Sequence, residues 1–389
     1  MVGVTLLGGA SPAAFLRTAW QKRPRLIRQA VPGFRGLVDR RALFSLATRA
    51  DVTSRLVVDH GPGRARRWER HDGPFGALGA RMLPTRGWTL LVHGLEGLVR
   101  GGWELLRAFS FVPAARVDDL MVSYAADGGS VGPHDDRYDV FLLQGPGRRR
   151  WRLARGGDRA LDARASIDVL ARFEPEEEHL LEPGDMLYLP PGVAHHGVAE
   201  GPCYTYSIGF LAPAEDELVR GFAGWLAGVA GSAEVDADAI YADPGLRPPR
   251  DALALPDAMI AYARGAIERH LHGLLREPRL AEDFLGAFLT RPRPRARFVS
   301  RRGVSAEALA RRLRGRGALR LALPTRALVR GDRVFVNGEA HALPAAARRA
   351  LDPLLRDRSL RLPWRVPPPL LPLLVAWLAV GWIELDARA

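Results

Sequence analysis

The chain has 389 residues, of which 47% are hydrophobic and 25% charged, so we expect a soluble globular protein of two or three domains. Its single cysteine, Cys203, excludes an intramolecular disulfide and fits a reducing compartment. The longest apolar run, 370–383, is shorter than the about 20 residues of a membrane-spanning helix. Because the start of the chain also lacks the order of a secretion signal, we expect a cytoplasmic protein without membrane contact. The net charge of +13 favours a polyanionic neighbourhood.

The first predicted element is a short helix within residues 11–24. Ser11 is its capping residue and Pro12 occupies the first helical position. A strand is expected to follow at residues 26–29. From Trp88 to about Pro213, β-rich runs alternate with glycine and proline turns, so a β-barrel is expected there.

His134 and Asp136 form an H-x-D pair on a predicted strand. Side chains two apart on a strand share a face, so both can reach one metal ion. A third ligand from a distant strand would complete a 2-His-1-carboxylate facial triad with open positions for substrates. Although an isolated H-x-D pair is common, the surrounding sequence favours the ligand set of an iron oxygenase.

Two adjacent histidines, His195 and His196, follow a turn, the predicted strand 186–189 and a Pro-Pro-Gly turn. Together with the glycine-rich turn 127–133 before His134, this order is typical of a double-stranded β-helix, the cupin-like barrel. Adjacent residues on an extended chain point in opposite directions, so geometry alone leaves the third ligand open. The spacing Pro-Pro-Gly-x-x-His selects His195, and His196 would then tune the site or face solvent.

An arginine lies on the apolar face of the predicted strand 148–153, which follows the H-x-D pair in the sequence. Alternation groups Arg149 with Trp151 and Leu153. A buried guanidinium needs an anionic partner and pairs bidentately with carboxylates. We therefore predict that Arg149 holds the distal carboxylate of 2-oxoglutarate; the alternative is a salt bridge to an acidic residue of the barrel.

Thr205 and Ser207 share one face of the last predicted barrel strand. Either hydroxyl could hydrogen-bond the carboxylate that Arg149 holds, or both are ordinary strand residues.

Beyond Pro213, apolar residues recur at helical spacing to about residue 289, which predicts helices for a subunit interface or a brace. The stretch RPRPRARFVSRR at 291–302 predicts a solvated hinge; an RNA-contacting arm is the alternative.

The last part of the chain has the order of a winged-helix module. A helix is predicted at 306–313, strands at 319–323 and 333–336, a hairpin turn at Asn337-Gly338, and further helices from about Pro344 and Pro369.

The motifs GPHDDRYDVF (132–141), QGPGRRRW (144–151) and LEPGDMLYLPPGVAH (181–195) resemble those of bacterial JmjC-type ribosomal oxygenases. The resemblance extends from WQKRPRLIRQAVPG (20–33) to VNGE (336–339). Enzymes of this family hydroxylate C3 of an arginine in large-subunit ribosomal protein sixteen. The implied fold class is α+β.

The resemblance implies a JmjC barrel at 1–213, a helical dimerisation region at 214–295 and a winged-helix domain at 296–389. It also implies Fe(II) and 2-oxoglutarate as cofactor and cosubstrate, a basic ribosomal protein as substrate, and a homodimer. The implied roles are carried by these residues: His134, Asp136 and His195 as iron ligands, with no further catalytic residue; Arg149 for 2-oxoglutarate; and Asp127 for the substrate guanidinium, although family members differ at that position. Otherwise Asp127 is a plain turn residue.

A basic substrate would be repelled by a chain of charge +13, and the acidic stretch 174–178 could supply a local attraction unless it is only a solvated loop. An alternative is the same chemistry on a ribosomal histidine or on RNA. A weak contact with RNA is a separate expectation. A further alternative is a non-catalytic metal-binding regulator with a DNA-binding winged helix.

Overall fold

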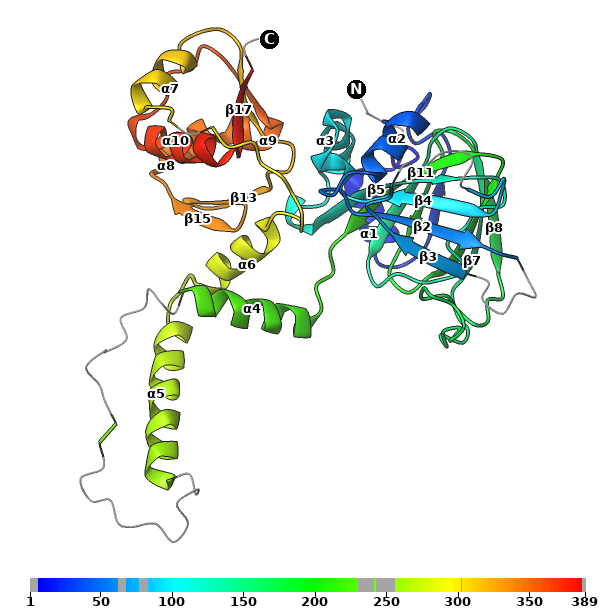
Figure 1. The fold of residues 1–389 in the computed structure, drawn as a ribbon, viewed down its shortest axis with the longest axis horizontal. Coiled ribbons are helices and arrows are strands. Elements are labelled where there is room, and N and C mark those ends of the chain that lie inside the picture. Colours follow the sequence, from blue (N-terminus) through cyan, green and yellow to red (C-terminus); the bar gives the residue numbers. More distant parts are fainter. Residues whose placement is uncertain are drawn as a thin grey trace. The chain divides into compact units, whose positions relative to one another are not determined.

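Two antiparallel sheets face each other and form a barrel (Figure 1). The structure, a computed structural model, describes residues 6–61, 68–76, 83–229, 241–242, 256–301 and 303–386. The larger sheet has the order β1-β9-β6-β11-β5-β4-β2-β3 and the smaller one β10-β7-β8. The strands of the larger sheet are β1 Arg25–Ile27, β2 Ser54–Asp59, β3 Trp68–Asp72, β4 Trp88–Val92, β5 Val117–Ala125, β6 Asp139–Gln144, β9 Met186–Leu189 and β11 Cys203–Phe210. Those of the smaller sheet are β7 Arg148–Ala154, β8 Glu177–Leu181 and β10 Ala194–Glu200.

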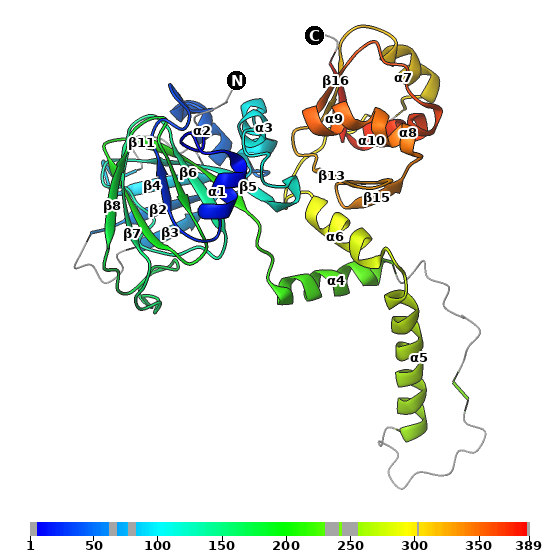
Figure 2. The same ribbon diagram turned by 180° about the vertical axis from the view of Figure 1, so that it is seen from behind.

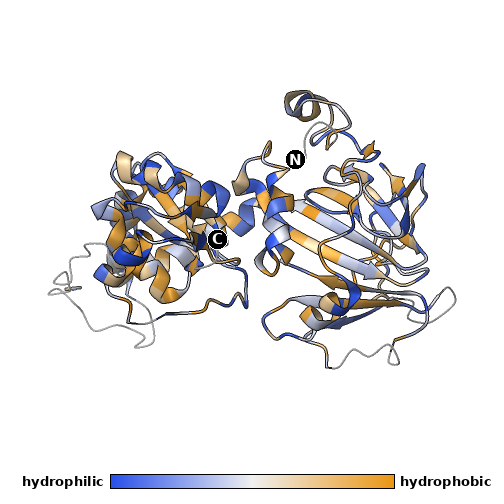
Figure 3. Cartoon of the chain, turned by 90° about the horizontal axis from the view of Figure 1, so that it is seen from above, coloured by the Kyte–Doolittle hydropathy of each residue, from blue (hydrophilic) through white to orange (hydrophobic). Residues whose placement is uncertain are grey.

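The barrel interior is filled by side chains from the inner faces of both sheets. Leu142 and Leu187 of the larger sheet pack with Trp151, Leu153 and Leu181 of the smaller one. These residues alternate with outward-facing neighbours along their strands, as the period of a strand requires. Hydrophobic and hydrophilic positions are accordingly interleaved along the strands (Figure 3). Free Cys203 is buried on β11.

Helices cover the outer face of the larger sheet (Figure 2). They are α1 Pro12–Thr18, α2 Arg40–Ala47 and α3 Arg100–Arg107, with the short 3-10 turns η1 Leu95–Gly97 and η2 Ala114–Arg116. Phe15 of α1, for example, packs on Phe141 of β6. The predicted cap of α1 is confirmed, since the Ser11 hydroxyl accepts a hydrogen bond from the Ala14 N–H at 3.2 Å.

The barrel begins earlier than the sequence predicted. Strands β2 and β3 precede Trp88 and extend the larger sheet beyond β4. β3 has the sequence WERHD, which carries one apolar residue and no alternation. It forms a strand because β2 offers it a backbone partner from Arg55 to Asp59. The first strand, β1, also lies one or two residues before its predicted position.

Contacts divide the chain into two units, residues 1–212, 292–325 and 349–389, and residues 213–291 and 326–348. Besides the barrel, the first unit contains α7 Ala306–Leu313, β12 Ala318–Leu321, α9 Asp352–Asp357, β16 Ser359–Arg361, η4 Pro368–Leu370, α10 Leu371–Val380 and β17 Ile383–Asp386. Its second sheet has the order β16-β12-β17. Helix α10 buries Leu374, Trp377 and Leu378, so the apolar run near the end of the chain is a packed core helix.

The second unit contains α4 Glu215–Val229, α5 Asp257–Leu275, α6 Leu280–Thr290, β13 Ala327–Arg330, β14 Arg333–Val336 and β15 Glu339–Ala342. Helix α8 Ala345–Ala350 spans the division. Asn337 and Gly338 have φ angles of 50° and 93° between β14 and β15, which confirms the predicted hairpin turn. Among the described residues, none of the helices combines the length and apolarity needed to cross a membrane.

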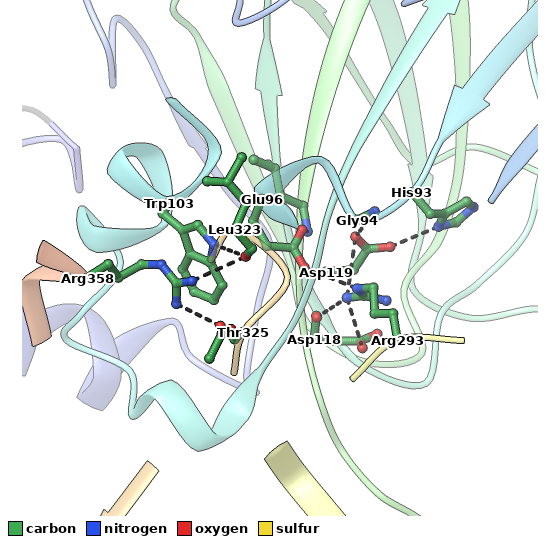
Figure 4. A network of polar contacts seen from close by, with 11 residues as sticks. His93, Gly94, Glu96, Trp103, Asp118, Asp119, Arg293, Leu323, Thr325 and Arg358 are labelled. Carbon is green, nitrogen blue, oxygen red and sulfur yellow. Dashed lines mark hydrogen bonds and ion pairs between the residues drawn. The ribbon is translucent and has the colours of Figure 1, made fainter. Parts of the chain in front are cut away.

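The segment predicted as a solvated hinge contains a buried contact within the first unit. Its described backbone is irregular, as expected. Arg293, however, points at Glu96, Asp118 and Asp119 (Figure 4). Its Nε lies 3.1 Å from a Glu96 carboxylate oxygen, and its Nη2 donates to the carbonyl oxygen of Asp118. The solvated-hinge prediction is therefore wrong for Arg293, because these carboxylates lie on elements that the sequence alone does not place beside the linker.

A second contact joins the barrel helices to the C-terminal part of the same unit. The guanidinium of Arg358 lies 4.0 Å from the centre of the Trp103 ring and donates to the carbonyl oxygens of Ala322, Leu323 and Thr325. The Trp103 indole also donates to the carbonyl oxygen of Leu323 at 3.0 Å (Figure 4).

Candidate metal centre

Three predicted ligands meet at one end of the barrel. One ligand atom from each of His134, Asp136 and His195 lies within 4.8 Å of the others. His195 Nε2 is 3.8 Å from Asp136 Oδ2, and the two imidazole centroids are 4.3 Å apart. Two imidazoles and one carboxylate at this spacing can hold a divalent metal ion with coordination positions to spare.

Backbone contacts hold the two histidines. His134 and His195 form an isolated antiparallel β-bridge, in which the N–H of His134 donates to the carbonyl oxygen of His195 at 3.0 Å and the reverse bond measures 2.8 Å. Each ring Nδ1 lies 3.0 Å from a carbonyl oxygen two residues earlier, that of Gly132 or of Val193. An Nδ1–H that donates there leaves the Nε2 lone pair for a metal ion.

The H-x-D pair does not lie on a regular strand. His134 takes part only in the isolated bridge, and Asp136 lies in an irregular segment before β6. The strand prediction is wrong for these residues because partners on another segment hold them. The Asp136 carbonyl oxygen accepts from Gly192 N–H at 2.8 Å, which ties the pair to the Pro-Pro-Gly turn before His195.

The electrostatics of the site favour a neutral His195. Burial, and secondly the neighbouring His134, lower the pKa of His195 to about 4, while Asp136 opposes the shift. The imidazole is therefore neutral near pH 7, the state in which it binds metal ions.

The structure separates the two adjacent histidines. His195 points into the barrel, whereas the ring of His196 lies on the other face of β10, with its centroid 6.3 Å from that of Trp68 and 6.0 Å from that of Phe173. Of the two candidates, the geometry brings His195 to the other ligands.

Arg149 lies on the inner face of β7, as the alternation predicted. Its side chain is almost completely buried, with the residue 3% exposed, and its Nε and Nη2 have no hydrogen-bond partner. In the part of the chain that the structure describes, Arg149 forms no ion pair, so the alternative of an internal salt bridge is not found. The guanidinium lies 5.7 Å from the Trp151 ring centre, and Trp151 packs against His195 at a centroid distance of 5.7 Å. A buried cation with unused donors fits a ligand carboxylate that reaches inward from the metal ion.

Thr205 and Ser207 both face the interior from β11, but they differ in their partners. Thr205 donates to Gln144 Oε1 at 3.4 Å. Ser207 is 9% exposed and sits opposite Leu142 and Met121. Within the described residues its hydroxyl forms no hydrogen bond, so Ser207 is the freer of the two to bind a ligand.

Asp127 already has partners within the chain. Its Oδ1 accepts from the N–H of Gly201 at 2.9 Å, and its Oδ2 lies 3.2 Å from Arg86 Nη2. Gly201 follows the end of β10, whereas His195 lies at its beginning. Six extended residues span about 20 Å. The structure therefore does not bring Asp127 to the metal ligands, and its role toward a substrate stays a prediction.

Two of the four glutamates in the acidic stretch 174–178 pair with arginines of β7 and the turn that follows. Glu178 lies 2.5 Å from Arg150 and 2.7 Å from Arg152, and Glu177 lies 2.5 Å from Arg155. These pairs reduce the negative charge that Glu177 and Glu178 could offer to a basic partner. The role of this stretch in attracting a basic substrate stays a prediction.

Tyr138 is a residue near the site that the sequence reasoning missed. Burial, and secondly the Asp136 carboxylate, raise the pKa of Tyr138, so its phenol keeps its proton beside a predicted ligand. The two-residue step that links His134 to Asp136 also leads to Tyr138, and could have indicated it.

A 2-His-1-carboxylate group inside a double-stranded β-helix defines the class of cupin-like, metal-dependent oxygenases. A family model described as JmjC domain matches residues 104–218, and one described as ROXA-like winged helix matches residues 269–383. The chain is 35% identical over 282 residues to the ribosomal protein uL16 3-hydroxylase of Escherichia coli strain K12. The matched region covers 72% of this chain and 71% of that protein. It is 37% identical over 214 residues to a probable ribosomal oxygenase of Haemophilus influenzae, covering 54% and 52% of the two chains.

Solved structures agree with this result. YcfD, a ribosomal oxygenase from Escherichia coli solved in complex with cobalt and 2-oxoglutarate, matches with a TM-score of 0.77 and 30% identity over 97% of this chain and 99% of that one. Another structure of that protein gives a TM-score of 0.79. The chain belongs to the JmjC-domain ribosomal oxygenases. The predicted fold class, a JmjC barrel with a C-terminal winged helix, is confirmed.

Proposed function

We propose that this protein is an Fe(II)- and 2-oxoglutarate-dependent hydroxylase that oxidises C3 of an arginine in a large-subunit ribosomal protein. The observation that carries the proposal is the buried, unpaired guanidinium of Arg149 on the inner face of the barrel, with Trp151 between it and the metal ligand His195. The names of the relatives support it, since one is a ribosomal protein uL16 3-hydroxylase and another was solved with cobalt and 2-oxoglutarate.

Each side chain of the site has a role in this proposal. His134, Asp136 and His195 would bind iron through Nε2, a carboxylate oxygen and Nε2. Arg149 would pair with the distal carboxylate of 2-oxoglutarate, and Ser207 would donate a hydrogen bond to it. When bound, iron and 2-oxoglutarate use O2 to insert one oxygen atom into a C–H bond, releasing succinate and CO2. The chain positions the reacting carbon, and its apolar interior excludes water.

Asp127 is the residue of this chain proposed to bind the substrate arginine. Asp127 would bind the substrate guanidinium only if it released Arg86 and the N–H of Gly201. Replacement of Asp127 by Asn therefore tests the role directly. A raised KM for the ribosomal substrate with an unchanged KM for 2-oxoglutarate supports it, and two unchanged constants contradict it.

We also propose a catalytic domain at 1–213, a dimerisation region at 214–295 and a winged-helix domain at 296–389, in a cytoplasmic homodimer. Helix α5 supports the dimer, because Ile267, Leu271 and Leu275 recur every four residues and are 59%, 39% and 69% exposed. A stripe of this kind is typical of a helix that packs against a partner. Light scattering of wild type and Leu271→Asp tests it: a dimer that dissociates in the variant is expected, and a monomeric wild type contradicts it.

The substrate class is tested by incubation with isolated ribosomal proteins, iron and 2-oxoglutarate, followed by peptide mass mapping. Addition of the mass of one oxygen atom to an arginine is expected. The same addition to a histidine or to RNA would keep the chemistry and change the substrate. Absence of succinate with every ribosomal fraction would favour a non-catalytic metal-binding regulator.

A further inference from the structure

Arginines of two segments in the C-terminal part of the first unit lie side by side. One segment is the end of α7 and the turn after it, with Arg312, Arg314 and Arg316; the other holds Arg361 and Arg365. The backbone joins the segments, since Trp364 N–H donates to Leu313 O at 2.8 Å and Leu362 N–H to Gly317 O at 2.9 Å. We call these five arginines the α7–β16 surface, after the elements labelled in Figure 2.

The α7–β16 surface differs from the arginine cluster that faces the glutamates of β8. All five of its arginines are exposed, and within the described residues none of them forms an ion pair. The exposed or half-exposed barrel arginines Arg150, Arg152 and Arg155 each lie within 2.7 Å of a glutamate oxygen.

Carboxylates near the surface in sequence or sheet order do not neutralise it, and Asp357 pairs with Arg107. Glu307 lies in the first turn of α7, at the end away from Arg314. Asp386 pairs with Arg320 at 3.4 Å. Glu384 is exposed on β17, which lies on the other side of β12 from β16. The α7–β16 surface therefore keeps a net positive charge.

We propose that the α7–β16 surface binds RNA through its phosphates. Guanidinium groups pair bidentately with phosphate oxygens, and several of them along one surface follow a nucleic-acid backbone. Half-buried Trp364 lies between Arg361 and Arg365, where the exposed part of its indole can stack on an unpaired base. A basic protein would be repelled by the same charges.

This proposal assigns RNA binding to the α7–β16 surface and not to Arg293 of the linker. Arg293 of the linker is already paired with Glu96, Asp118 and Asp119. The inference does not rest on the proposed hydroxylase function, because it uses no residue of the metal centre. The two proposals can therefore fail separately.

The test is fluorescence anisotropy of a labelled single-stranded RNA with the full chain over a series of salt concentrations. The variant is Arg314→Glu/Arg316→Glu/Arg365→Glu. The control, Arg17→Glu/Arg35→Glu/Arg41→Glu, changes the net charge equally at exposed arginines that form no ion pair in the described structure. We expect the variant to weaken binding at least about tenfold and the slope of log K against log salt to fall by about 2, the value for three lost phosphate contacts on a single strand.

The control should bind RNA with an affinity within about twofold of wild type, because it leaves all five arginines of the α7–β16 surface in place. Equal weakening in both triple variants would overturn the proposal, because it would reduce the binding to net charge. Displacement of RNA by polyglutamate at equal charge concentration would overturn it in favour of an acidic protein partner. Thermal unfolding of all three proteins, expected to coincide, shows that a loss of binding is not a loss of fold.

Discussion

His134 and His195 are joined by a single β-bridge, with backbone hydrogen bonds of 3.0 and 2.8 Å in the two directions. The bridge uses no side-chain atom, so the metal centre depends on the backbone for its geometry and on the imidazoles for its chemistry. Substitution of one imidazole should therefore remove a ligand while leaving the other histidine in place. This separation allows the fold and the function to be tested apart.

Replacing Arg149 with Leu should abolish 2-oxoglutarate binding without destabilising the ligand-free protein. The guanidinium donors Nε and Nη2 are buried and unpaired, so the apolar residue removes a desolvation penalty of about 1–3 kcal/mol. Calorimetric titration with 2-oxoglutarate and denaturant unfolding measure the two effects. A large loss of stability in Arg149→Leu would show that the arginine has a structural partner instead.

Ser207→Ala should raise the KM for 2-oxoglutarate more than Thr205→Val does. The Ser207 hydroxyl forms no hydrogen bond among the described residues, whereas that of Thr205 already donates to Gln144. A lost hydrogen bond to a charged group costs about 1.5–3 kcal/mol, which corresponds to roughly a tenfold or larger rise in KM. Steady-state kinetics decide the order, and an equal or reversed effect would remove Ser207 from the site.

Arg293→Ala should lower the free energy of unfolding by about 3–5 kcal/mol, because it leaves Glu96 without its cation and Asp119 with only His93 as a basic partner. Both carboxylates are largely buried beside it. Urea unfolding of the variant measures the loss. Arg164→Ala is a suitable control, since Arg164 pairs with Asp162 at the surface, where a pair contributes about 0–1 kcal/mol. Equal losses in the two variants would contradict the buried contact.

The protein should lose the stabilising contribution of the Asp185 carboxylate as the pH falls into the acid range. Its carboxylate accepts from the N–H groups of Gln29 and Glu182 and from Arg28, and these bonds outweigh burial and lower the pKa of Asp185. The stabilisation is thus complete above the ordinary carboxyl pKa and is lost as the pH falls through the lowered value. Unfolding free energies of wild type and Asp185→Asn should therefore converge at low pH. A difference that does not depend on pH would contradict this assignment.

Local patterns in the sequence were sufficient to predict the ligands and the orientation of Arg149. Alternation along β7 places Arg149 on the inner face whatever lies opposite, and the Pro-Pro-Gly spacing selects His195. The cap of α1 and the hairpin turn at Asn337 are local features of the same kind.

Contacts between distant segments could not be predicted from the sequence. The pairing of Glu178 with Arg150 and Arg152 depends on the register between β7 and β8. The partners of Arg293 lie about 175 to 197 residues away along the chain, and no local pattern indicates them. Asp127 shows the same limit, since a turn residue has no periodicity that reveals its neighbours.

The most direct test measures succinate release and substrate mass together for wild type and His134→Ala, each incubated with Fe(II), 2-oxoglutarate, O2 and isolated large-subunit ribosomal proteins. The metal centre predicts that wild type releases one succinate for each oxygen atom added to an arginine, and that the variant, folded but lacking one ligand, does neither. Identical substrate masses from both proteins would contradict the assignment of the metal centre as the site of oxidation.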